Sequence, residues 1–435
     1  MKSSSYCSPK LSDSDVAPLH LAGKRAVAVM YSAYPADPRP RRAAEALARE
    51  GVIVEVICLK ATDEELERES FGGVDITRIP LKHRRAGKFT YLAQYGSFIL
   101  ISGGILASRA LRRPYDLVHV HNVPDVLVFS ALMPKILGAK VILDLHDPMP
   151  ELMATIFGAR DNSSSVWVLK KLEKWSLRFA DQIITCSEVW RRIFVTRSCL
   201  PEKIAVIMNS PDEKIFRHRQ PVGQNLGRGD SSKPFVIMYH GALVERHGLD
   251  LAVLALQKVR ETIPSVELRI YGCKTPFLKQ VLDLVIQLDL CAAVRYLGPM
   301  KLEQISDAIG ECDVGIIPNR RSKFTELNTP TRIFEFLSQA KPVIAPMSAG
   351  ILEYFGPQEL VLFQLGDVDD LAAKIEYVFR HPEEMIGIVQ RGQEVYLAHQ
   401  WSNERRRFVS LADRLLKGAK RPLADRSMIW GNPKD

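Results

Sequence analysis

Short apolar runs alternate with amphipathic segments along most of the chain. In the first half, the uninterrupted apolar runs predict buried strands, and the segments between them repeat apolar residues at helical spacing. The predicted strands are 26–35, 52–59, 116–122, 139–147, 181–187 and 202–211, and the predicted helices are 41–51, 123–138 and 169–180. Such alternation is typical of a parallel sheet with helices on both faces.

The pattern breaks at residues 217–234, which are polar and rich in Gly, Pro and Ser, as in a linker. It then restarts with strands at 235–241, 266–272, 294–300 and 314–319, helices at 249–264, 276–290 and 303–313, and a strand and helix within 359–379. We therefore predict two doubly wound α/β domains, 24–216 and 235–400, after a loose tail at 1–23. A C-terminal helix is expected within 401–435, for which a return to the N-terminal domain is one option. Ligands of such sheets bind at the carboxyl ends of the strands.

One stretch, 89–108, contains twenty residues without a charge and is flanked by basic residues on both sides. Its length could span a bilayer, but its hydrophobicity is moderate and symmetric flanks favour no orientation. Three alternatives stay open: a membrane span, helices at a membrane interface, or a buried helix pair, with Gly103–Gly104 as a helix break.

The composition narrows the class of protein. The 435 residues carry a formal net charge of +9, which suits nucleic acid, an anionic membrane surface or phosphate-bearing ligands. No nucleic-acid module, Walker motif or G-x-G-x-x-G motif is present, so nucleic acid is the least favoured partner. The seven cysteines are scattered without C-x-x-C spacing, which favours reduced thiols in a cytoplasmic compartment over disulfides or a zinc site.

Residues 329–346 combine a helix and a short buried strand. Thr329 is a predicted N-cap, Pro330 the first helical residue, and Pro342 the end of the helix. Backbone N–H groups at such a helix start suit a diphosphate. The helix carries a single carboxylate, Glu335, which is either a solvated surface group or part of a binding site.

Four stretches resemble glycosyltransferase family 4, whose members have the GT-B fold: 33–59, 115–147, 179–216 and 241–346. Together they span roughly residues 26–410. The resemblance implies two Rossmann-like domains facing across a cleft, and retaining transfer of a sugar from a nucleotide diphosphate sugar to an acceptor hydroxyl. It implies that no metal is required and that the C-terminal domain binds most of the donor.

By this resemblance, Glu335 accepts hydrogen bonds from the nucleotide ribose hydroxyls. Arg246 and Arg332 are the expected cations on the leaving diphosphate, because preorganised charge there stabilises the transition state. The donor-binding candidates are Gly241, Thr329, Thr331 and Glu335.

The chain departs from the family at three positions. Family members carry a second glutamate eight residues before the first, where this chain has Leu327, and Glu326 is one residue away. Ala242 and His247 stand where many members have an arginine and a lysine on the diphosphate. These departures place sugar recognition, and the activity itself, in question.

In the N-terminal domain, His146 matches the family histidine near the transferred sugar and is a catalytic candidate by this resemblance. Asp147 and Glu151, which follow it, are candidate acceptor-side groups. His119 and His121 alternate with Val120 on a strand, so one of them is expected to face the core, and their spacing is not a metal signature.

The segment 36–42 is cationic, and Arg39, Arg41 and Arg42 could meet phosphates of the donor or of a lipid-linked acceptor. The alternative is a charged first turn of a helix. Residues 366–370 contain Asp-x-Asp, which we interpret as a helix N-cap and not as a metal site.

The predicted function is a retaining glycosyltransferase of polysaccharide or glycolipid synthesis. Its expected partners are a nucleotide-sugar donor, a saccharide or lipid-linked acceptor and, as an option, the anionic inner face of the plasma membrane. Two alternatives stay open: a nucleotide-sugar epimerase of the same fold, and a non-catalytic scaffold subunit.

Overall fold

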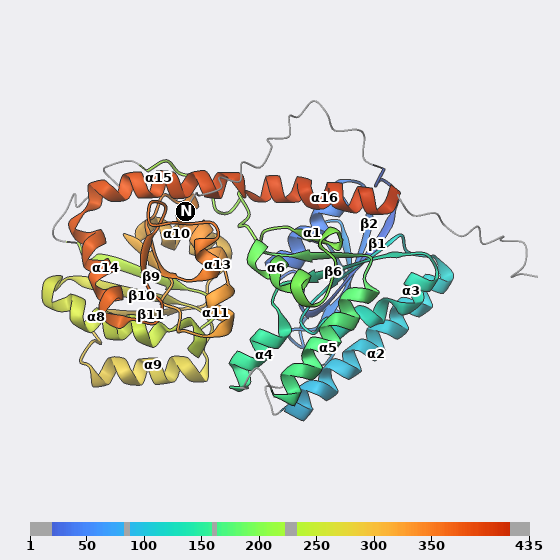
Figure 1. The fold of residues 1–435 in the computed structure, drawn as a ribbon, viewed down its shortest axis with the longest axis horizontal. Helices are drawn as coiled ribbons and strands as arrows, with labels where there is room; N and C mark the ends of the chain where they lie inside the picture. The colour runs from blue at the N-terminus through green and yellow to red at the C-terminus, as the bar shows by residue number, and fades with distance from the viewer. Residues whose placement is uncertain (1–19, 82–87, 159–162, 222–232, 418–435) are drawn as a thin grey trace, which may run out of the picture. The chain divides into compact units, whose positions relative to one another are not determined.

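The computed structural model describes residues 20–81, 88–158, 163–221 and 233–417 (Figure 1). Several predicted segments lie wholly or partly outside this description: most of the tail 1–23 and of the linker 217–234, the last part of 401–435, and the basic residues 82–85. The described residues fall into two compact units. One holds those up to Leu143, Ala180–Gln182 and the chain from Arg407; the other holds Asp144–Phe179 and Ile183–Arg406. The predicted domain boundaries stay a prediction.

The first sheet has eight strands in the order β3-β4-β2-β1-β5-β6-β7-β8. The strands are β1 (Arg25–Ala33), β2 (Ile53–Leu59), β3 (Arg68–Phe71), β4 (Val74–Ile79), β5 (Leu117–His121), β6 (Lys140–Leu145), β7 (Gln182–Thr185) and β8 (Ile204–Val206). Every strand predicted in this half is confirmed, whereas the antiparallel β3–β4 pair was not predicted.

The helices of this half include all three predicted segments, 41–51, 123–138 and 169–180, together with others that were not predicted. They are α1 (Pro38–Arg49), α2 (Lys88–Arg112), η1 (Asp125–Ala131), α3 (Leu132–Ile136), α4 (Met149–Phe157), α5 (Ser164–Phe179), α6 (Glu188–Arg197) and η2 (Pro201–Lys203). The predicted helix at 123–138 is a 3-10 segment that continues into α3.

The second sheet is parallel, with the order β11-β10-β9-β12-β13-β14. Its strands are β9 (Phe235–His240), β10 (Val266–Tyr271), β11 (Val294–Gly298), β12 (Val314–Ile316), β13 (Val343–Met347) and β14 (Val361–Gln364). Strand order reverses between β9 and β12, and ligands of open α/β sheets bind at such a point.

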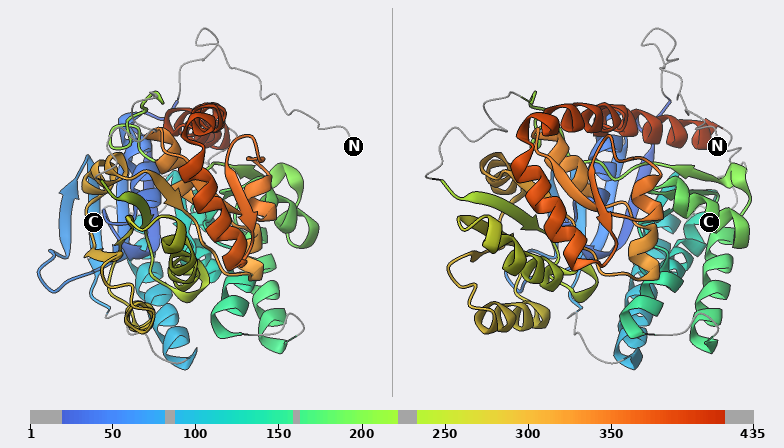
Figure 2. Two further views of the ribbon diagram at one scale, coloured as in Figure 1. Left: turned by 90° about the vertical axis from the view of Figure 1, so that its left-hand side faces the viewer. Right: turned by 60° about the vertical axis from the view of Figure 1, so that its left-hand side comes forward.

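Helices cover both faces of the second sheet, as predicted (Figures 1 and 2). One core layer takes side chains from α8, α9, α14 and the first part of α15, and the other takes them from α10, α12, α13 and the later part of α15. Their bounds are α8 (Leu249–Thr262), α9 (Pro276–Gln287), α10 (Leu302–Glu311), α12 (Thr331–Ser338), α13 (Ala349–Leu352), α14 (Val368–Arg380) and α15 (Pro382–Ala398). The remaining elements are η3 (Glu245–His247), α11 (Lys323–Leu327) and α16 (Trp401–Lys417). As predicted, Asp367 caps α14 by accepting bonds from two backbone N–H groups.

The uncharged stretch 89–108 lies within one continuous helix, α2. The predicted break at Gly103–Gly104 is wrong, because the helix runs through both residues. The alternative of a buried helix pair is excluded, since α2 is a single helix with one buried face that includes Phe98 and Leu106. A Cβ at Gly103 would lie 3.6 Å from the Cα of Ser130, so the glycine brings α2 close to η1. None of the described helices combines the length and apolarity needed to cross a membrane.

The start of α12 differs from the prediction. The helix begins at Thr331 and Pro330 is the N-cap, so Thr329 does not cap it. The Thr329 hydroxyl donates instead to the backbone oxygen of Gly350, at 2.6 Å. The helix also ends at Ser338, before Pro342, and Ala340 in the following turn has a positive φ of 57°.

Candidate functional site

The loop after β9 lies at the point where strand order reverses in the second sheet. Gly241 follows the last residue of β9 and has a φ of +123°, which favours glycine. At the end of the loop, Gly248 precedes α8, and a Cβ there would lie 1.9 Å from the oxygen of Pro318 after β12. Glycine therefore allows the β9 and β12 loops to touch, and the backbone N–H of Arg320 donates to the oxygen of Arg246, at 3.1 Å.

Helix α12 places two predicted site residues beside this loop. Arg332 Nη1 donates to the backbone oxygen of His240, at 2.8 Å, and its guanidinium carbon lies 4.8 Å from the centre of the Tyr239 ring. A Cβ at Gly241 would be 3.4 Å from Arg332 Cδ, so the arginine lies directly over the glycine. Glu335 follows one helical turn later, and its Oε2 is 3.3 Å from His240 Nε2. Gly241, Arg332 and Glu335 thus form one cluster.

His240 orients this cluster and was not predicted. Its side chain is buried, its backbone oxygen holds Arg332, and its ring meets Glu335. Burial and the charge of Arg332 lower its pKa to about 3, while the Glu335 carboxylate favours the protonated ring. We take burial to dominate, so the ring is neutral near pH 7. The strand-end rule that singled out His146 applies equally to His240, at the end of β9.

The two predicted threonines hold backbone segments. The Thr331 hydroxyl donates to the oxygen of Asn209 and accepts from its side-chain amide, both at 3.0 Å. Thr329 holds Gly350, as described above. They position the first turn of α12, which contains no acidic residue. A helix start without acids suits an anion.

Arg246 lies in the same loop, on η3. Burial lowers the pKa of its guanidinium, and the carboxylate of Asp147 acts in the opposite direction. Its Nε is buried without a hydrogen-bond partner among the described residues, and the guanidinium carbon lies 5.6 Å from the centre of the Phe324 ring. Since an arginine stays protonated in proteins, Arg246 contributes a partly desolvated positive charge.

His247 carries no such charge. Its Nδ1 lies 2.9 Å from the oxygen of Ala242, and burial with the nearby Arg332 lowers its pKa to about 3. Nδ1 therefore donates to Ala242, and the ring is neutral near pH 7. Of these neighbouring residues, Arg246 is the cation.

The position eight residues before Glu335 supplies no carboxylate. The backbone of Leu327 packs against Gly350, where a Cβ would lie 2.4 Å from the Leu327 carbonyl carbon. The neighbouring Glu326 is paired with Arg321, at 2.9 Å.

His146 and Asp147 follow β6 in the first sheet. His146 Nε2 lies 3.9 Å from the buried carboxylate of Asp144 two residues earlier. Glu151 is held by Arg197, whose Nη2 donates to Oε2 at 3.0 Å. Its charge is therefore engaged within the fold, which weighs against the predicted acceptor-side role.

The predicted cationic segment lies in the first turn of α1. Arg39 is buried, and Arg41 Nε donates to Glu45, at 2.8 Å, one helical turn later. The Arg41 guanidinium carbon is 5.2 Å from the centre of the Phe71 ring. These contacts match the alternative of a charged helix turn.

His119 and His121 on β5 are both buried, and their ring centres are 4.1 Å apart. We predicted that one of them faces the core, and both side chains are buried. His119 also stacks on Phe408, with 5.3 Å between the ring centres.

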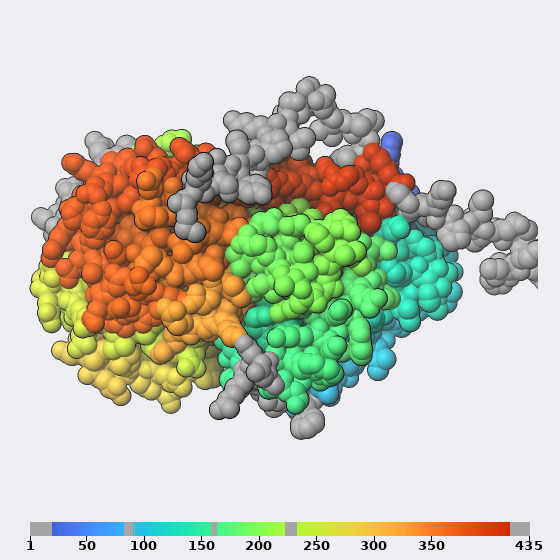
Figure 3. Space-filling model, viewed as in Figure 1, coloured from blue at the N-terminus to red at the C-terminus, as the bar shows by residue number. Residues whose placement is uncertain are grey.

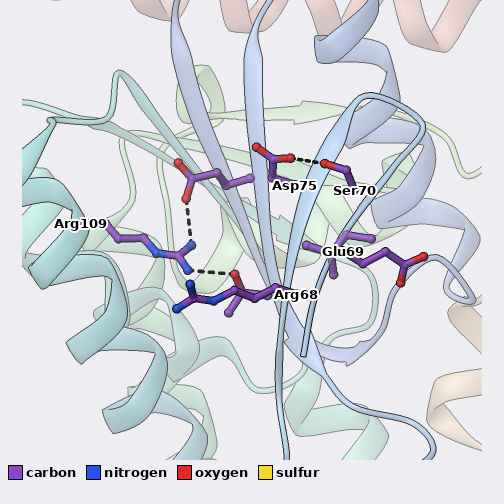
Figure 4. Close-up of a pocket in the computed structure, with 8 residues that line it drawn as sticks. Arg68, Glu69, Ser70, Asp75 and Arg109 are labelled. Atoms are coloured by element: carbon purple, nitrogen blue, oxygen red, sulfur yellow. Dashed lines mark hydrogen bonds and ion pairs between the residues drawn. The ribbon is translucent and has the colours of Figure 1, made fainter. Parts of the chain in front are cut away.

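A separate cavity of about 390 Å³ lies against the β3–β4 hairpin and contains none of the predicted site residues (Figure 4). Arg109 of α2 crosses it and donates to Glu55 and Thr77, both at 2.9 Å. Asp75 accepts from Ser70 at its edge. These opposite charges are paired with one another, as in an ion-pair network that supports the hairpin.

A second pair missed from the sequence lies between the β9 and β12 loops. Arg320 is hydrogen-bonded to Asp250 in the first turn of α8. The two residues are 70 positions apart, so no local pattern connects them. Together with Gly248, they fix the loop that carries Arg246.

This geometry suits a ribose and a diphosphate. The half-buried Glu335 carboxylate lies on α12, two guanidinium groups lie within or against the adjacent loop, and Gly241 lies beneath Arg332. A carboxylate accepts from vicinal hydroxyls, and guanidinium groups bind phosphate oxygens in pairs.

Comparisons with known protein families agree with this interpretation. A model of the glycosyl transferase 4-like domain matches residues 36–210, and a model of the glycosyl transferases group 1 matches residues 227–395. Together they account for most of the sequence, and the chain belongs to the GT4-type glycosyltransferases.

Among curated relatives, the chain is similar to "Probable glycosyltransferase WbjE" of Pseudomonas aeruginosa, with 23% identity over 56% of this chain and 60% of the relative. It is also similar to "Putative colanic acid biosynthesis glycosyltransferase WcaL" of Salmonella typhimurium, with 23% identity over 46% of this chain and 48% of the relative. The matches thus span about half to three fifths of each relative.

Solved structures confirm the GT-B fold. Sucrose-phosphate synthase of Thermosynechococcus elongatus has a TM-score of 0.74 at 17% identity, over 91% of this chain and all of that one. HepE of Anabaena, solved in complex with UDP and glucose, has a TM-score of 0.65 at 16% identity, over 90% of this chain and all of that one.

Proposed function

We propose that this protein is a retaining glycosyltransferase that moves a sugar from a nucleotide diphosphate sugar to an acceptor hydroxyl. The observation that carries the proposal is the cluster of Gly241, Arg332 and Glu335 at the strand-order reversal of the second sheet. The complexes of HepE with UDP and glucose support a nucleotide-sugar donor. The name of WcaL supports an acceptor from polysaccharide synthesis, with a saccharide or lipid-linked saccharide as its class.

In the proposed reaction, the bond between the anomeric carbon and the diphosphate oxygen breaks. The acceptor hydroxyl forms a new bond to that carbon from the same face, and its proton passes to the leaving diphosphate. Glu335 holds the ribose, Arg246 and Arg332 stabilise the diphosphate, and His146 binds the sugar. Gly241, Thr329 and Thr331 shape the donor site, and Asp147, Arg39 and Arg41 remain weaker acceptor-side proposals. We propose that no metal takes part.

Glu335→Ala tests this assignment. Loss of a charge-assisted pair of hydrogen bonds should weaken donor binding by about ten- to hundredfold and abolish transfer. Calorimetry with UDP, GDP and ADP sugars measures the affinity, and Glu326→Ala is the matched control, because that carboxylate is paired with Arg321. Unchanged affinity in a folded Glu335→Ala variant contradicts the ribose role.

Two other functions are distinguishable. An epimerase of this fold would release an epimer or free nucleotide without any acceptor. A scaffold subunit, which Ala242, His247 and Leu327 would suit, would turn over no donor with any acceptor extract.

The proposed location is cytoplasmic, with peripheral docking on an anionic membrane as a finer proposal. On α2, Leu92 and Leu100 are 70% and 77% exposed, whereas Phe98 lies in the core and takes no part in docking. The basic residues 82–85 expected to assist lie outside the described residues. Release of the protein from acidic vesicles at high salt tests peripheral docking, because the Debye length shortens to about 3 Å near 1 M salt.

A further inference from the structure

Helix α5 presents an unusual outer face. Its most exposed side chains recur at steps of three and four, and they are Trp167, Val168, Lys171, Lys174, Trp175 and Arg178. Trp167 and Trp175 are 60% and 58% exposed, and Val168 is 45% exposed. Large apolar side chains that stay in water do not gain the favourable free energy of burial. Two tryptophans, two turns apart on one helix face, therefore mark a contact surface.

The opposite face of α5 fixes the helix in the protein. Val166, Ser176 and Leu177 are buried there. Glu173 is also fully buried, accepting from Arg197 Nε at 2.8 Å and from the Ser198 hydroxyl. Helix α5 is drawn as a ribbon in Figure 1 and its part of the chain as atoms in Figure 3, and the tryptophans stand on its exposed face.

The charges on the outer face have one sign. Glu173 is the sole acidic residue in the sequence of α5, and it points inward. Lys171, Lys174 and Arg178 remain on the exposed side, and Lys171 Nζ lies 5.3 Å from the centre of the Trp167 ring. The face therefore combines aromatic rings with three cations and no anion.

We propose that this face of α5 docks on an anionic phospholipid bilayer. Tryptophan favours the headgroup region, where its ring is buried and its N–H stays hydrated, and lysine and arginine are attracted to acidic lipids. The excess of positive charge in the whole chain, +9, acts in the same direction. The proposal extends the proposed function by adding a docking surface. It rests on that function because it assumes a lipid-linked acceptor.

Vesicle flotation of the full chain tests the proposal. We expect binding to vesicles of phosphatidylcholine and phosphatidylglycerol in a 3:1 ratio at low salt, and weak binding to pure phosphatidylcholine. Trp167→Ala/Trp175→Ala should lower binding by about tenfold or more, because the interfacial anchors are lost. Lys171→Ser/Lys174→Ser should lower binding by a similar factor and reduce its dependence on salt.

Matched controls separate this face from general charge and from α2. Lys258→Ser/Lys279→Ser, on α8 and α9, removes the same charge elsewhere and should leave binding within about twofold. Leu92→Ser/Leu100→Ser tests α2. The proposal is overturned if the α5 variants float like the wild type, if only the α2 variant loses binding, or if the wild type ignores acidic vesicles. Failure of the wild type to bind acidic vesicles would instead indicate that this face of α5 binds a protein partner.

The same variants keep this proposal separate from the proposed function. Nucleotide binding, measured by calorimetry without vesicles, should be unchanged in all α5 variants. Failure of the wild type to bind any nucleotide would contradict the glycosyltransferase proposal, whereas flotation would still decide the role of α5.

Discussion

Strands β1 and β9 occupy the same position in their sheets, each at a reversal of strand order, but their carboxyl ends are built differently. After β9, Gly241 takes a positive φ and Arg332 lies over it. After β1, the chain turns through the fully buried Tyr34 and enters α1. The β9 end thus places a glycine beneath a cation, whereas the β1 end continues into a buried aromatic residue.

The cations at the two ends also have different partners. Arg41 in α1 is paired with Glu45 at helical spacing, whereas Arg332 donates to a backbone carbonyl. The Nε of Arg246 is buried and has no hydrogen-bond partner among the residues that the structure describes. A guanidinium paired with an acid in its own helix stabilises that helix modestly. Arg332 is held by a neutral carbonyl and keeps its charge for a ligand, which is why we propose that phosphate binds at the second sheet.

The largest expected effect is at Arg246. Arg246→Ala should lower turnover by about a hundredfold or more, the scale seen when one transition-state donor is lost. Arg49→Ala, in the last turn of α1, is the control at the other sheet and should change turnover by less than about threefold, because its charge is paired with Glu45. Steady-state assays of donor consumption measure both. Equal losses in the two variants would remove the distinction between the sheets.

Acid stability sharpens the comparison, because the β9 end carries a buried histidine and residues 25–49 around β1 and α1 contain none. The pKa of His240 is about 3 in the fold and near 6.5 when unfolded. Protonation of His240 therefore leaves the free energy of unfolding unchanged above pH 6.5 and lowers it as the pH falls from 6.5 toward 3. Between pH 8 and 5 this amounts to about 2 kcal/mol. Urea unfolding at both pH values should show a smaller loss for His240→Gln than for the wild type; equal losses contradict the buried neutral ring.

His240 should affect binding more than turnover. His240→Ala leaves Glu335 less well oriented, so KM for the donor should rise by about tenfold while kcat changes little. His240→Gln, which can place a side-chain amide beside the Glu335 carboxylate, should restore most of the affinity. A fall in kcat at unchanged KM would show that His240 acts on the reacting centre instead.

The smallest effect is expected at His247. Because its pKa is lowered to about 3, the ring is neutral at pH 8 and at pH 6. His247→Ala should lower turnover by about threefold or less at both pH values, through loss of its bond to Ala242. A larger effect than that of Arg246→Ala would place the phosphate charge on the wrong residue.

The sequence was informative where burial follows a simple period. Strands such as β9 and β10 are apolar runs, and their positions were predicted within one or two residues. The β3 strand was missed because all four of its residues are exposed and leave no apolar signal. Gly103 and Gly104 suggested a break, but the helix runs through both, and the contact of Gly103 with Ser130 depends on a distant segment.

The candidate site divides in the same way. Gly241, Arg332 and Glu335 were found because a family motif is local in sequence. His240 and the Arg320–Asp250 pair were missed because their contacts join separate loops. Thr329 was misassigned as a cap because the N-cap rule does not anticipate a competing carbonyl, here that of Gly350.

Hydrogen exchange with and without nucleotide tests the central claim most directly. The nucleoside diphosphate that binds best among UDP, GDP and ADP is added to the full chain, and amide exchange is followed by mass spectrometry. If the donor binds at the second sheet, we expect slower amide exchange in peptides covering 241–248 and 329–338, with little change in 34–42. Protection confined to 34–42, or no binding of any of the three nucleotides, would contradict a donor site built on the second sheet.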